Sequence, residues 1–468
     1  GNAPGSARWP GRGGAACARG RKGGVVKGAE PGRGGGVSDP GAPRQPLRVA
    51  LVIDLFPPIV GGAETHARDL AVALVREGAV VTVLTRRARE ELPAHEVLPP
   101  GVEVVRIGEP GSPRWGKYAF VPALLRAWRR RAADFDVACL CGFRVLGWPL
   151  LGATARTGTP LALRAEACGE MSGEFIWHPP GGVPSRGKRW IFAPLVRLRN
   201  RRLRRHGQFL AISSVVADEF RAAGVPAARL QVLPNGIDLE RFRPPVPGER
   251  EALREEFGWA EGDLVFLYSG KLNRGKGLPA LLAAWKEYVQ GGGQGTLVLV
   301  GAGGGQFLSE EDHLRRTVEA GRLEGRVRFT GYRQDVERWL RAADVFVFPS
   351  ESESFGLAPL EANATGLPVI ATGAGALAET VPDGIAGRRV PVGDPAALCR
   401  AMIELAGDPA ARERIGQSGR ERVEREYSFG AVARRYLAWF EELAAGAGKG
   451  SERYRQQGPD GPRGARRA

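Results

Sequence analysis

Two glutamates eight positions apart, Glu353 and Glu361, are the residues whose spacing most directly suggests chemistry. The apolar run at 345–348 predicts a buried strand, residues 349–356 a loop, and residues 357–365 a short helix. The two acids therefore bracket a helix start. Backbone N–H groups at a helix N-terminus attract anions such as phosphate, which carboxylates cannot bind. We therefore expect a phosphate at the helix start and hydroxyl groups on the two glutamates.

A phosphate flanked by hydroxyl groups fits a nucleotide diphosphate sugar, whose diphosphate lies between a ribose and a hexose. The spacing of the two acids, with Ser-Phe-Gly between them, resembles the donor motif of the family 4 glycosyltransferases of the GT-B fold. Four further segments resemble that family in the same order: 52–85 with its Gly-Gly-Ala-Glu loop at 61–64, then 233–238, 270–277 and 329–331. The resemblance covers residues 47–445.

The resemblance implies a role for each residue of the donor motif. Glu361 matches the acid that holds the ribose hydroxyls. Glu353 matches the acid that addresses the transferred sugar, together with the backbone of Phe355, Gly356 and Leu357. We therefore expect Glu353 to lie nearest to the reacting atoms.

The donor phosphates are expected between two glycine-containing loops. Lys276 matches the family, whereas Lys271 stands where the family usually has arginine. A lysine keeps the charge but loses the two-pronged geometry, so Arg274 is an alternative partner. Gly61 and Gly62 follow the first strand, where glycine lets the backbone approach a phosphate closely.

Family 4 enzymes retain the anomeric configuration and need no metal. The resemblance thus implies a front-face transfer in which a donor phosphate oxygen helps to deprotonate the acceptor, with no metal or other cofactor. Glu353 and Lys276 are the candidate catalytic residues. The nucleotide base is expected near Gly331, Tyr332 and Arg333, through backbone contacts.

The acceptor side departs from the family pattern. Many members carry a histidine in the segment that corresponds to residues 163–169, and this chain has none there. Arg164 or Glu166 is the candidate for part of that role, and Glu166 as a bystander remains an alternative. None of the five histidines has a partner that the sequence identifies.

The length and the apolar pattern predict an α/β protein with more than one domain. At 468 residues the chain exceeds what one hydrophobic core usually serves. A strand at 48–53, a glycine loop, a helix at 64–77 and a strand at 80–85 form a βαβ unit, and the pattern restarts at 264–269. We expect two doubly wound, Rossmann-like parallel-sheet domains facing a cleft, as the resemblance to GT-B proteins implies.

Further strands are predicted at 102–107, 137–141, 160–164, 208–212 and 231–233, and then at 295–300, 326–329, 345–348 and 368–372. The expected parts are a Gly/Arg-rich tail at 1–46, an acceptor-binding domain at 47–240, a nucleotide-sugar-binding domain at 241–426, a helix at 427–446 that returns to the first domain, and a second tail at 447–468.

The net charge of +16 is concentrated at the chain ends. Residues 1–46 hold eight Lys/Arg against two acids, and residues 447–468 hold six against two. Both ends lack hydrophobic periodicity, so we expect disordered basic tails and no nucleic-acid partner. With no signal peptide, no apolar run of about 18 residues and no Cys-x-x-Cys pair, we expect a cytoplasmic protein.

The stretch 186–205 is basic and amphipathic, with nine basic residues and no acid. Two interpretations stay open: binding to an anionic membrane surface that carries the acceptor, or a surface helix whose apolar side covers the sheet. The first would make the protein peripheral on the cytosolic membrane face.

Two other patterns imitate functional motifs. Asp134 and Asp136 have the spacing of a metal-binding pair, but they precede a strand at its amino end, so we interpret them as solvated residues. The glycines at 301–305 imitate a dinucleotide fingerprint whose third glycine is missing, because Gln306 stands there.

The sequence therefore predicts a retaining glycosyltransferase that uses a nucleotide sugar and a glycan or lipid-linked acceptor. The alternatives are a nucleotide-sugar epimerase or hydrolase of the same fold, and a catalytically silent glycan-binding protein.

Overall fold

The structure is a computed structural model that describes residues 45–59, 61–110, 116–173, 186–260, 262–303 and 309–456. Nearly all of the tail expected at 1–46 and the last part of the one expected at 447–468 lie outside the described residues. From Pro46 onward the chain forms one compact unit.

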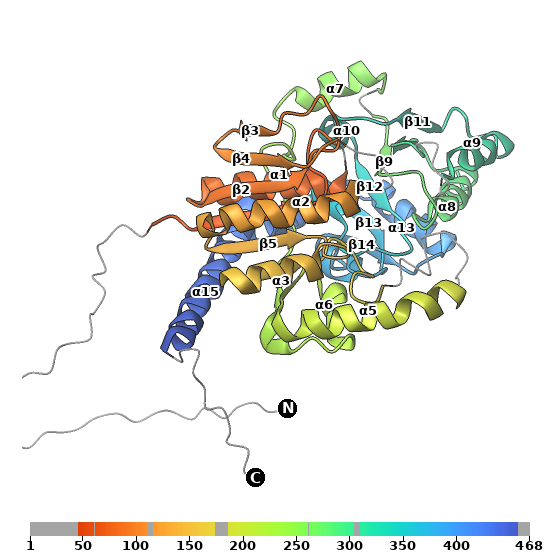
Figure 1. The fold of residues 1–468 in the computed structure, drawn as a ribbon. Coiled ribbons are helices and arrows are strands. Elements are labelled where there is room, and N and C mark those ends of the chain that lie inside the picture. The colour runs from red at the N-terminus through yellow and green to blue at the C-terminus, as the bar shows by residue number, and fades with distance from the viewer. Residues whose placement is uncertain are drawn as a thin grey trace, which may run out of the picture. The chain divides into compact units, whose positions relative to one another are not determined.

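The first sheet has eight strands within the described residues, in the order β3-β4-β2-β1-β5-β6-β7-β8 (Figure 1). All neighbouring pairs are parallel except β3 with β4. The strands are β1 (Arg48–Ile53), β2 (Val80–Arg86), β3 (His95–Leu98), β4 (Val102–Ile107), β5 (Val137–Cys141), β6 (Leu161–Arg164), β7 (Gln208–Ala211) and β8 (Leu230–Val232).

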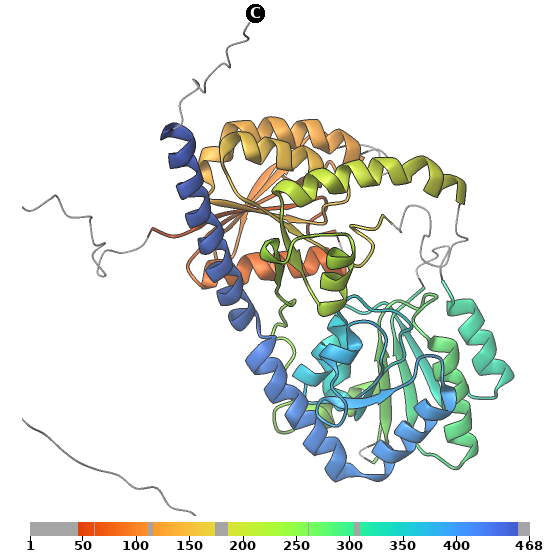
Figure 2. The same ribbon diagram turned by 90° about the horizontal axis from the view of Figure 1, so that it is seen from below.

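Helices cover both faces of this sheet, which explains why its central strands are apolar throughout. The helices are α1 (Gly62–Arg76), α2 (Gly116–Arg131), α3 (Gly147–Thr157), α5 (Arg186–His206) and α6 (Ser214–Ala222), with single turns η1 (Ala132–Asp134) and η2 (Ala227–Arg229). In β1, Val49 to Val52 are fully buried. Helices α2, α3 and α5 lie on one face and α1 on the other (Figure 2).

The second sheet has six strands in the described part of the chain, in the order β11-β10-β9-β12-β13-β14, and all its neighbouring pairs are parallel. The strands are β9 (Val265–Ser269), β10 (Thr296–Val300), β11 (Val327–Gly331), β12 (Val345–Phe348), β13 (Val369–Thr372) and β14 (Gly387–Val390). The helices are α7 (Glu249–Phe257), α8 (Leu278–Gln290), α9 (Glu311–Ala320), α10 (Val336–Ala342), α11 (Leu357–Ala364), α12 (Leu377–Thr380), α13 (Pro395–Gly407) and α14 (Pro409–Glu426).

The last helix, α15 (Phe429–Gln456), returns to the first sheet and packs against α1 and β5 (Figure 2). Its apolar residues Val432, Tyr436 and Phe440 are fully buried. The helix is longer than the sequence pattern predicts. Its backbone continues to Gln456, so residues 447–456, which we expected to be disordered, are helical.

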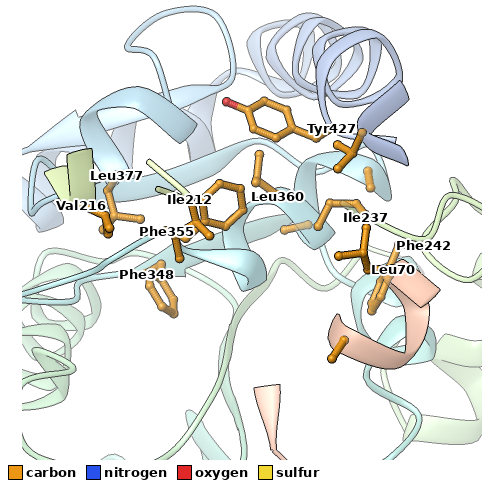
Figure 3. Packing of buried hydrophobic residues seen from close by; sticks show 14 of the residues in the cluster. Leu70, Ile212, Val216, Ile237, Phe242, Phe348, Phe355, Leu360, Leu377 and Tyr427 are labelled. Carbon is orange, nitrogen blue, oxygen red and sulfur yellow. The ribbon is translucent and has the colours of Figure 1, made fainter. Parts of the chain in front are cut away.

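Buried apolar side chains form one continuous cluster that includes residues of both sheets. Figure 3 shows the part of this cluster where Ile212 and Val216, which follow β7, lie close to Phe355 and Leu377 from the second domain. The two domains are therefore joined by contacts between apolar side chains.

The predicted strands are all present, with ends shifted by at most two residues. Two short strands, β3 and β14, were not predicted. The side chains of β3 alternate in exposure, and β14 has the sequence Gly-Arg-Arg-Val, so neither strand contains an apolar run. Both are edge strands, which have little apolar surface to bury.

In each sheet, the strands that follow the first one along the chain are added first on one side of it and then on the other. Strand β1 lies between β2 and β5, and β9 lies between β10 and β12. In open parallel sheets, ligands bind outside the carboxyl ends of strands at such switch points. The loops that follow β1, β9 and β12 therefore carry the residues from which a site is built.

Candidate active site

The loops that follow β9 and β12 pack directly against each other. The backbone N–H of Glu351 donates to the carbonyl of Gly275 (2.9 Å), and Ser350 Oγ donates to the same carbonyl (3.3 Å). Gly277 has φ +67°, and a Cβ there would come within 1.9 Å of the Pro349 carbonyl oxygen. Only glycine permits this approach, so the two loops form one rigid wall.

Lys276 and Glu353 form an ion pair across these loops, although the sequence places them in separate motifs. Glu353 Oε1 also accepts a hydrogen bond from Ser350 Oγ (3.2 Å). The ammonium of Lys276 lies 5.6 Å from the centre of the Phe348 ring. Both candidate catalytic side chains are thus held in place and partly shielded from water, at 29% and 15% exposure.

Helix α11 starts directly after this pair. Gly356 is its N-cap residue with φ +88°, and no side chain caps the helix. A Cβ on Gly356 would lie 2.7 Å from Leu377, so glycine is required for packing as well as for conformation. Phe355 is buried, and the uncapped N–H groups of the first turn remain available to an anion or a sugar hydroxyl.

A cavity of ≈ 600 Å³ lies between the two domains. It brings together five residues that the sequence predicts for the site: Gly61, Gly62, Lys271, Leu357 and Glu361, and it also includes Tyr332 from the predicted base region. Of the residues predicted at the transferred sugar, Leu357 lines the cavity, whereas Glu353, Phe355 and Gly356 do not; Lys276, which was predicted at the phosphates, does not line it either. The cavity therefore contains the predicted ribose ligand and part of the predicted phosphate site.

Cations and helix ends face this cavity from opposite domains. Gly61 is the N-cap of the 15-residue helix α1, which no side chain caps, and a Cβ on Gly62 would meet open space. Lys271 lines the cavity from the second domain, whereas Arg274, the alternative phosphate partner, is exposed outside it. The Glu64 carboxylate lies against Gly61 at the start of α1, so an anion at this helix end would displace it, and the Lys271 ammonium faces the same place from the other domain.

Glu361 lies on α11 and lines the same cavity. The pKa of its carboxyl group is raised to about 7: burial is the largest cause, the charge of Arg241 opposes it, and Glu337 and Asp69 add to it. In the free protein this carboxyl group therefore titrates near neutral pH. Hydrogen bonds from two vicinal hydroxyl groups would stabilise its ionised form.

The predicted base region lies beside a second cavity of ≈ 400 Å³, which shares Lys271 and Tyr332 with the first. Arg333 lines it, and so do Gly301 to Gly303. The glycine segment that only imitates a dinucleotide fingerprint thus forms a wall of the candidate base pocket. A Cβ on Gly301 would lie 1.8 Å from the Gly270 carbonyl oxygen, which explains the glycine.

The structure does not place Arg164 at an open acceptor surface. Its side chain is 0% exposed. Its guanidinium pairs with Glu166 and donates to Asn235 Oδ1 (2.5 Å) and to Tyr436 Oη (3.1 Å). Because the side chain is fully buried and bound to these groups, Arg164 is a structural residue and not an acceptor ligand. Glu166, at 16% exposure, remains the acceptor-side candidate.

His66 has partners that the sequence did not reveal. It is buried, and its Nε2 accepts a hydrogen bond from the backbone N–H of Gly236 (3.1 Å), while its Nδ1 lies 3.1 Å from Arg164 Nη2. Burial, and then the charge of Arg164, lower the pKa of His66 well below its usual value. His66 is therefore neutral and structural. Asp69 and Arg241, which also line the main cavity, carry no motif that could have identified them.

The acid pair near β5 has arginine partners. Asp136 accepts hydrogen bonds from Arg48 Nη2 (2.7 Å) and Nε (3.2 Å), and Asp134 pairs with Arg131 (3.0 Å). In the residues that the structure describes, no group of three or more His, Cys, Asp or Glu side chains is arranged to hold a metal ion.

Two family models match the chain, and they fall on the two domains. The model described as "Glycosyltransferase Family 4" matches residues 60–241, and the model described as "Glycosyl transferases group 1" matches residues 263–408. The chain belongs to the family 4 glycosyltransferases. It is therefore a GT-B enzyme that transfers a sugar from a nucleotide sugar to an acceptor.

Curated relatives of this glycosyltransferase align over most of its length. A D-inositol 3-phosphate glycosyltransferase of Xylanimonas cellulosilytica is 28% identical over 398 residues, which is 82% of this chain and 90% of that protein. A GDP-mannose-dependent monoacylated alpha-(1-6)-phosphatidylinositol monomannoside mannosyltransferase of Corynebacterium glutamicum is also 28% identical, over 83% of this chain and 96% of that protein.

Solved structures confirm the fold of the glycosyltransferase. Sucrose-phosphate synthase from Thermosynechococcus elongatus superposes with a TM-score of 0.71 at 24% identity, over 86% of this chain and all of that chain. Anabaena HepE in complex with UDP and glucose gives a TM-score of 0.64 at 21% identity, over 84% of this chain and 99% of that chain.

The raised pKa of Glu361 leads to a testable pH dependence. We expect wild-type affinity for UDP-glucose or GDP-mannose, whichever binds, to increase as pH rises through about 7, because only the ionised carboxylate accepts two strong hydrogen bonds. Glu361→Gln should bind about tenfold more weakly at pH 8 and lose this pH step. Titration calorimetry between pH 6 and pH 8 measures both, and intact nucleotide sugars avoid the terminal phosphate ionisation of free diphosphates.

The raised pKa of Glu361 also leads to a prediction for protein stability, which should fall with rising pH whereas donor affinity increases. Because the folded-state pKa of Glu361 lies above its ordinary value of 4.5, stability falls as pH rises from about 4.5 to about 7. Glu361→Gln should therefore have a higher Tm than the wild type at pH 8, and no advantage below pH 4.5. Glu351→Gln, an exposed neighbour in the β12 loop, is the control; an equal Tm gain there would contradict the assignment.

Proposed function

We propose that this glycosyltransferase transfers the sugar of a nucleotide diphosphate sugar, with retention and without a metal, to a hydroxyl group of a phosphorylated or lipid-linked acceptor at a membrane surface. The observation that carries the donor part is the cavity in which the glycine loop, Lys271 and Glu361 meet from two domains. In this reading Glu361 holds the ribose, and Gly331 to Arg333 lie beside the base.

The charge of the leaving diphosphate is balanced by groups of both domains. The uncapped start of α1 and Lys271 face the cavity, and Lys276 lies on the adjoining wall. In the transfer, the bond between the anomeric carbon and the diphosphate oxygen breaks, and the acceptor oxygen bonds to the same face of that carbon. The acceptor proton passes to a diphosphate oxygen. Cations fixed before the reaction stabilise the developing charge without reorganisation.

Glu353 is the residue proposed to address the transferred sugar, because its carboxylate is fixed by Lys276 and Ser350 next to the start of α11. Glu353→Gln keeps the size but removes the charge and the ion pair. We expect it to lower the transfer rate at least 100-fold with little change in nucleotide-sugar affinity. The assay follows nucleoside diphosphate release from a panel of UDP- and GDP-sugars with a mixed acceptor extract.

Two controls make that result specific. Glu351→Gln should transfer like the wild type, and reactions without acceptor separate transfer from hydrolysis or epimerisation. Wild-type transfer by Glu353→Gln would refute the assignment, and donor conversion that needs no acceptor would favour the epimerase or hydrolase alternative.

Metal independence is supported by Lys271, which lines the cavity, and by Lys276 on the adjoining wall, since a fixed positive charge beside the diphosphate does what a divalent cation does in other transferases. We expect the transfer rate to stay within twofold after dialysis against EDTA, and Lys271→Ala to weaken donor binding about tenfold whether or not Mg²⁺ is added. A rate that falls with EDTA and returns with Mg²⁺ would refute this part.

The membrane part of the proposal is supported by helix α5. Trp190, Ile191, Leu195 and Leu198 are exposed on it, whereas Val196 and Leu203 anchor it to the domain. Beside it lies a cavity of ≈ 890 Å³ between α2, α3 and α5. Among the residues that the structure describes, its lining consists of apolar side chains and five cations, with no acid: Lys117, Arg144, Arg156, Arg199 and Arg202. Such a surface complements an anionic amphiphile. The curated relative named for a phosphatidylinositol monomannoside is consistent with it.

Among the described helices, none has both the length and the apolar composition that a membrane span requires. The proposed association therefore depends on α5.

We expect Leu195→Glu to reduce co-sedimentation with vesicles containing phosphatidylinositol at least fivefold, because it places a charge on the apolar face. Ile403→Glu on α13 is the matched control, since both residues are 55% exposed. Equal loss in both variants, or no loss in Leu195→Glu, would contradict a role for α5.

A further inference from the structure

The loop that follows β6, residues 165–173, is fixed by two carboxylates. Glu170 is buried, and its two oxygens accept hydrogen bonds from the backbone N–H groups of Phe143 (2.8 Å) and Glu166 (2.9 Å). Glu219 on α6 accepts from the N–H groups of Gly169, Met171 and Ser172 at 2.6 to 3.0 Å. The loop that carries Glu166 therefore has little conformational freedom.

Helix α5 is fastened to the same loop. Arg199 Nη2 donates to the Glu170 carbonyl oxygen (2.6 Å), and Asn200 Nδ2 donates to the Met171 carbonyl oxygen (2.6 Å). Whatever binds along α5 or at Glu166 thus acts on a rigid platform. That platform has one direct contact with the donor domain that the proposed mechanism does not use.

This contact is made by Ser354, which stands between Glu353 and Phe355. The backbone N–H of Cys168 donates to Ser354 Oγ (2.9 Å). The hydroxyl of Ser213, the buried N-cap residue of α6, donates to the Ser354 carbonyl oxygen (2.7 Å). Two segments of the first domain therefore hold one residue of the donor motif, on both its side chain and its backbone.

From the donor domain, Glu353 is fixed by other contacts. Its carboxylate pairs with Lys276, and its carbonyl oxygen accepts a hydrogen bond from the backbone N–H of Ala376 (3.0 Å). Gly375, with φ +55°, lies so close that a Cβ there would be 2.2 Å from that carbonyl oxygen. Opening of the domains would leave these contacts in place and remove those of Ser354.

We infer that Ser354 is a positioning residue that couples the acceptor-side loop to Glu353. When the domains meet, Cys168 and Ser213 complete the set of contacts that orders the Glu353 loop, so the sugar site is fully formed only when the acceptor domain is docked. This coupling favours transfer over hydrolysis, because an open enzyme holds the donor sugar less well. The inference rests on the role proposed above for Glu353.

A second contact between the domains provides a matched control. Glu379 Oε2 on α12 accepts hydrogen bonds from the backbone N–H (3.0 Å) and the hydroxyl (2.7 Å) of Ser214. This contact also joins the domains, but it does not touch the Glu353 loop. If domain docking alone mattered, losing it would have the same effect as losing the Ser354 contact.

The experiment compares Ser354→Ala, Ser354→Thr and Glu379→Ala in the full chain. Hydrogen exchange of the ligand-free proteins is measured on peptides that cover residues 349–356. We expect exchange there to become about fivefold faster in Ser354→Ala, because one hydrogen bond contributes roughly 1 kcal/mol. Ser354→Thr keeps the hydroxyl and should keep the protection, and Glu379→Ala, which removes the acceptor of Ser214, should leave it unchanged.

Kinetics supply the second measurement, with the donor and acceptor pair that the wild type turns over in the release assay. Ser354→Ala should lower kcat for transfer about tenfold and raise the share of donor lost to hydrolysis, with unchanged nucleotide-sugar affinity. Wild-type exchange and transfer in Ser354→Ala would overturn the inference, and so would equal losses in Glu379→Ala. Because hydrogen exchange needs no ligand, failure of the coupling can be told apart from a wrong donor or a wrong role for Glu353.

Discussion

One buried guanidinium joins the segments that set the two domains in place. Arg164 at the end of β6 contacts Asn235 in the connecting segment, Tyr436 on α15 and His66 on α1. Next to it, the backbone N–H of Ile237 donates to the Tyr427 carbonyl (2.7 Å), so the two crossings between the domains lie side by side. A buried cation that loses a partner costs about 3–5 kcal/mol, and this cost keeps both crossings in one arrangement.

The cleft depends on this arrangement because its walls come from different domains. The start of α1 and Asp69 belong to the first domain, whereas Lys271 and Glu361 belong to the second. Burial raises the pKa of both Asp69 and Glu361. Acidic side chains in such surroundings lower the stability of the free protein, and a ligand with hydroxyl groups would recover it. The site is thus organised for a polar ligand at some expense of stability, as is common at functional sites.

The donor side of the molecule follows the family pattern, whereas the acceptor side has features that are particular to this chain. The donor-side loops follow the strands at which an open parallel sheet binds ligands, and the family models cover both domains. The acceptor side is particular: Glu166 is held by the backbone clamp of Glu170, and α5 presents exposed apolar side chains beside a cationic cavity. The face that we propose contacts the acceptor is therefore the one where this chain departs from the family pattern.

The sequence by itself determined the described strands other than β3 and β14, the two-domain organisation and the loops that carry Lys271, Lys276, Glu353 and Glu361. It could do so because apolar periodicity and glycine positions are local properties, and because a parallel sheet brings the carboxyl ends of its strands to one edge. The roles of those four side chains remain predictions that the proposed variants test.

Only the tertiary structure decided which distant residues meet. It paired Lys276 with Glu353, buried Arg164 away from any acceptor, and brought Asp69 to face Glu361. It also placed Cys168 against Ser354, 186 positions away in the chain. The physical reason is that such contacts depend on how two domains pack and on which groups burial deprives of water, and no local pattern of residue types encodes either.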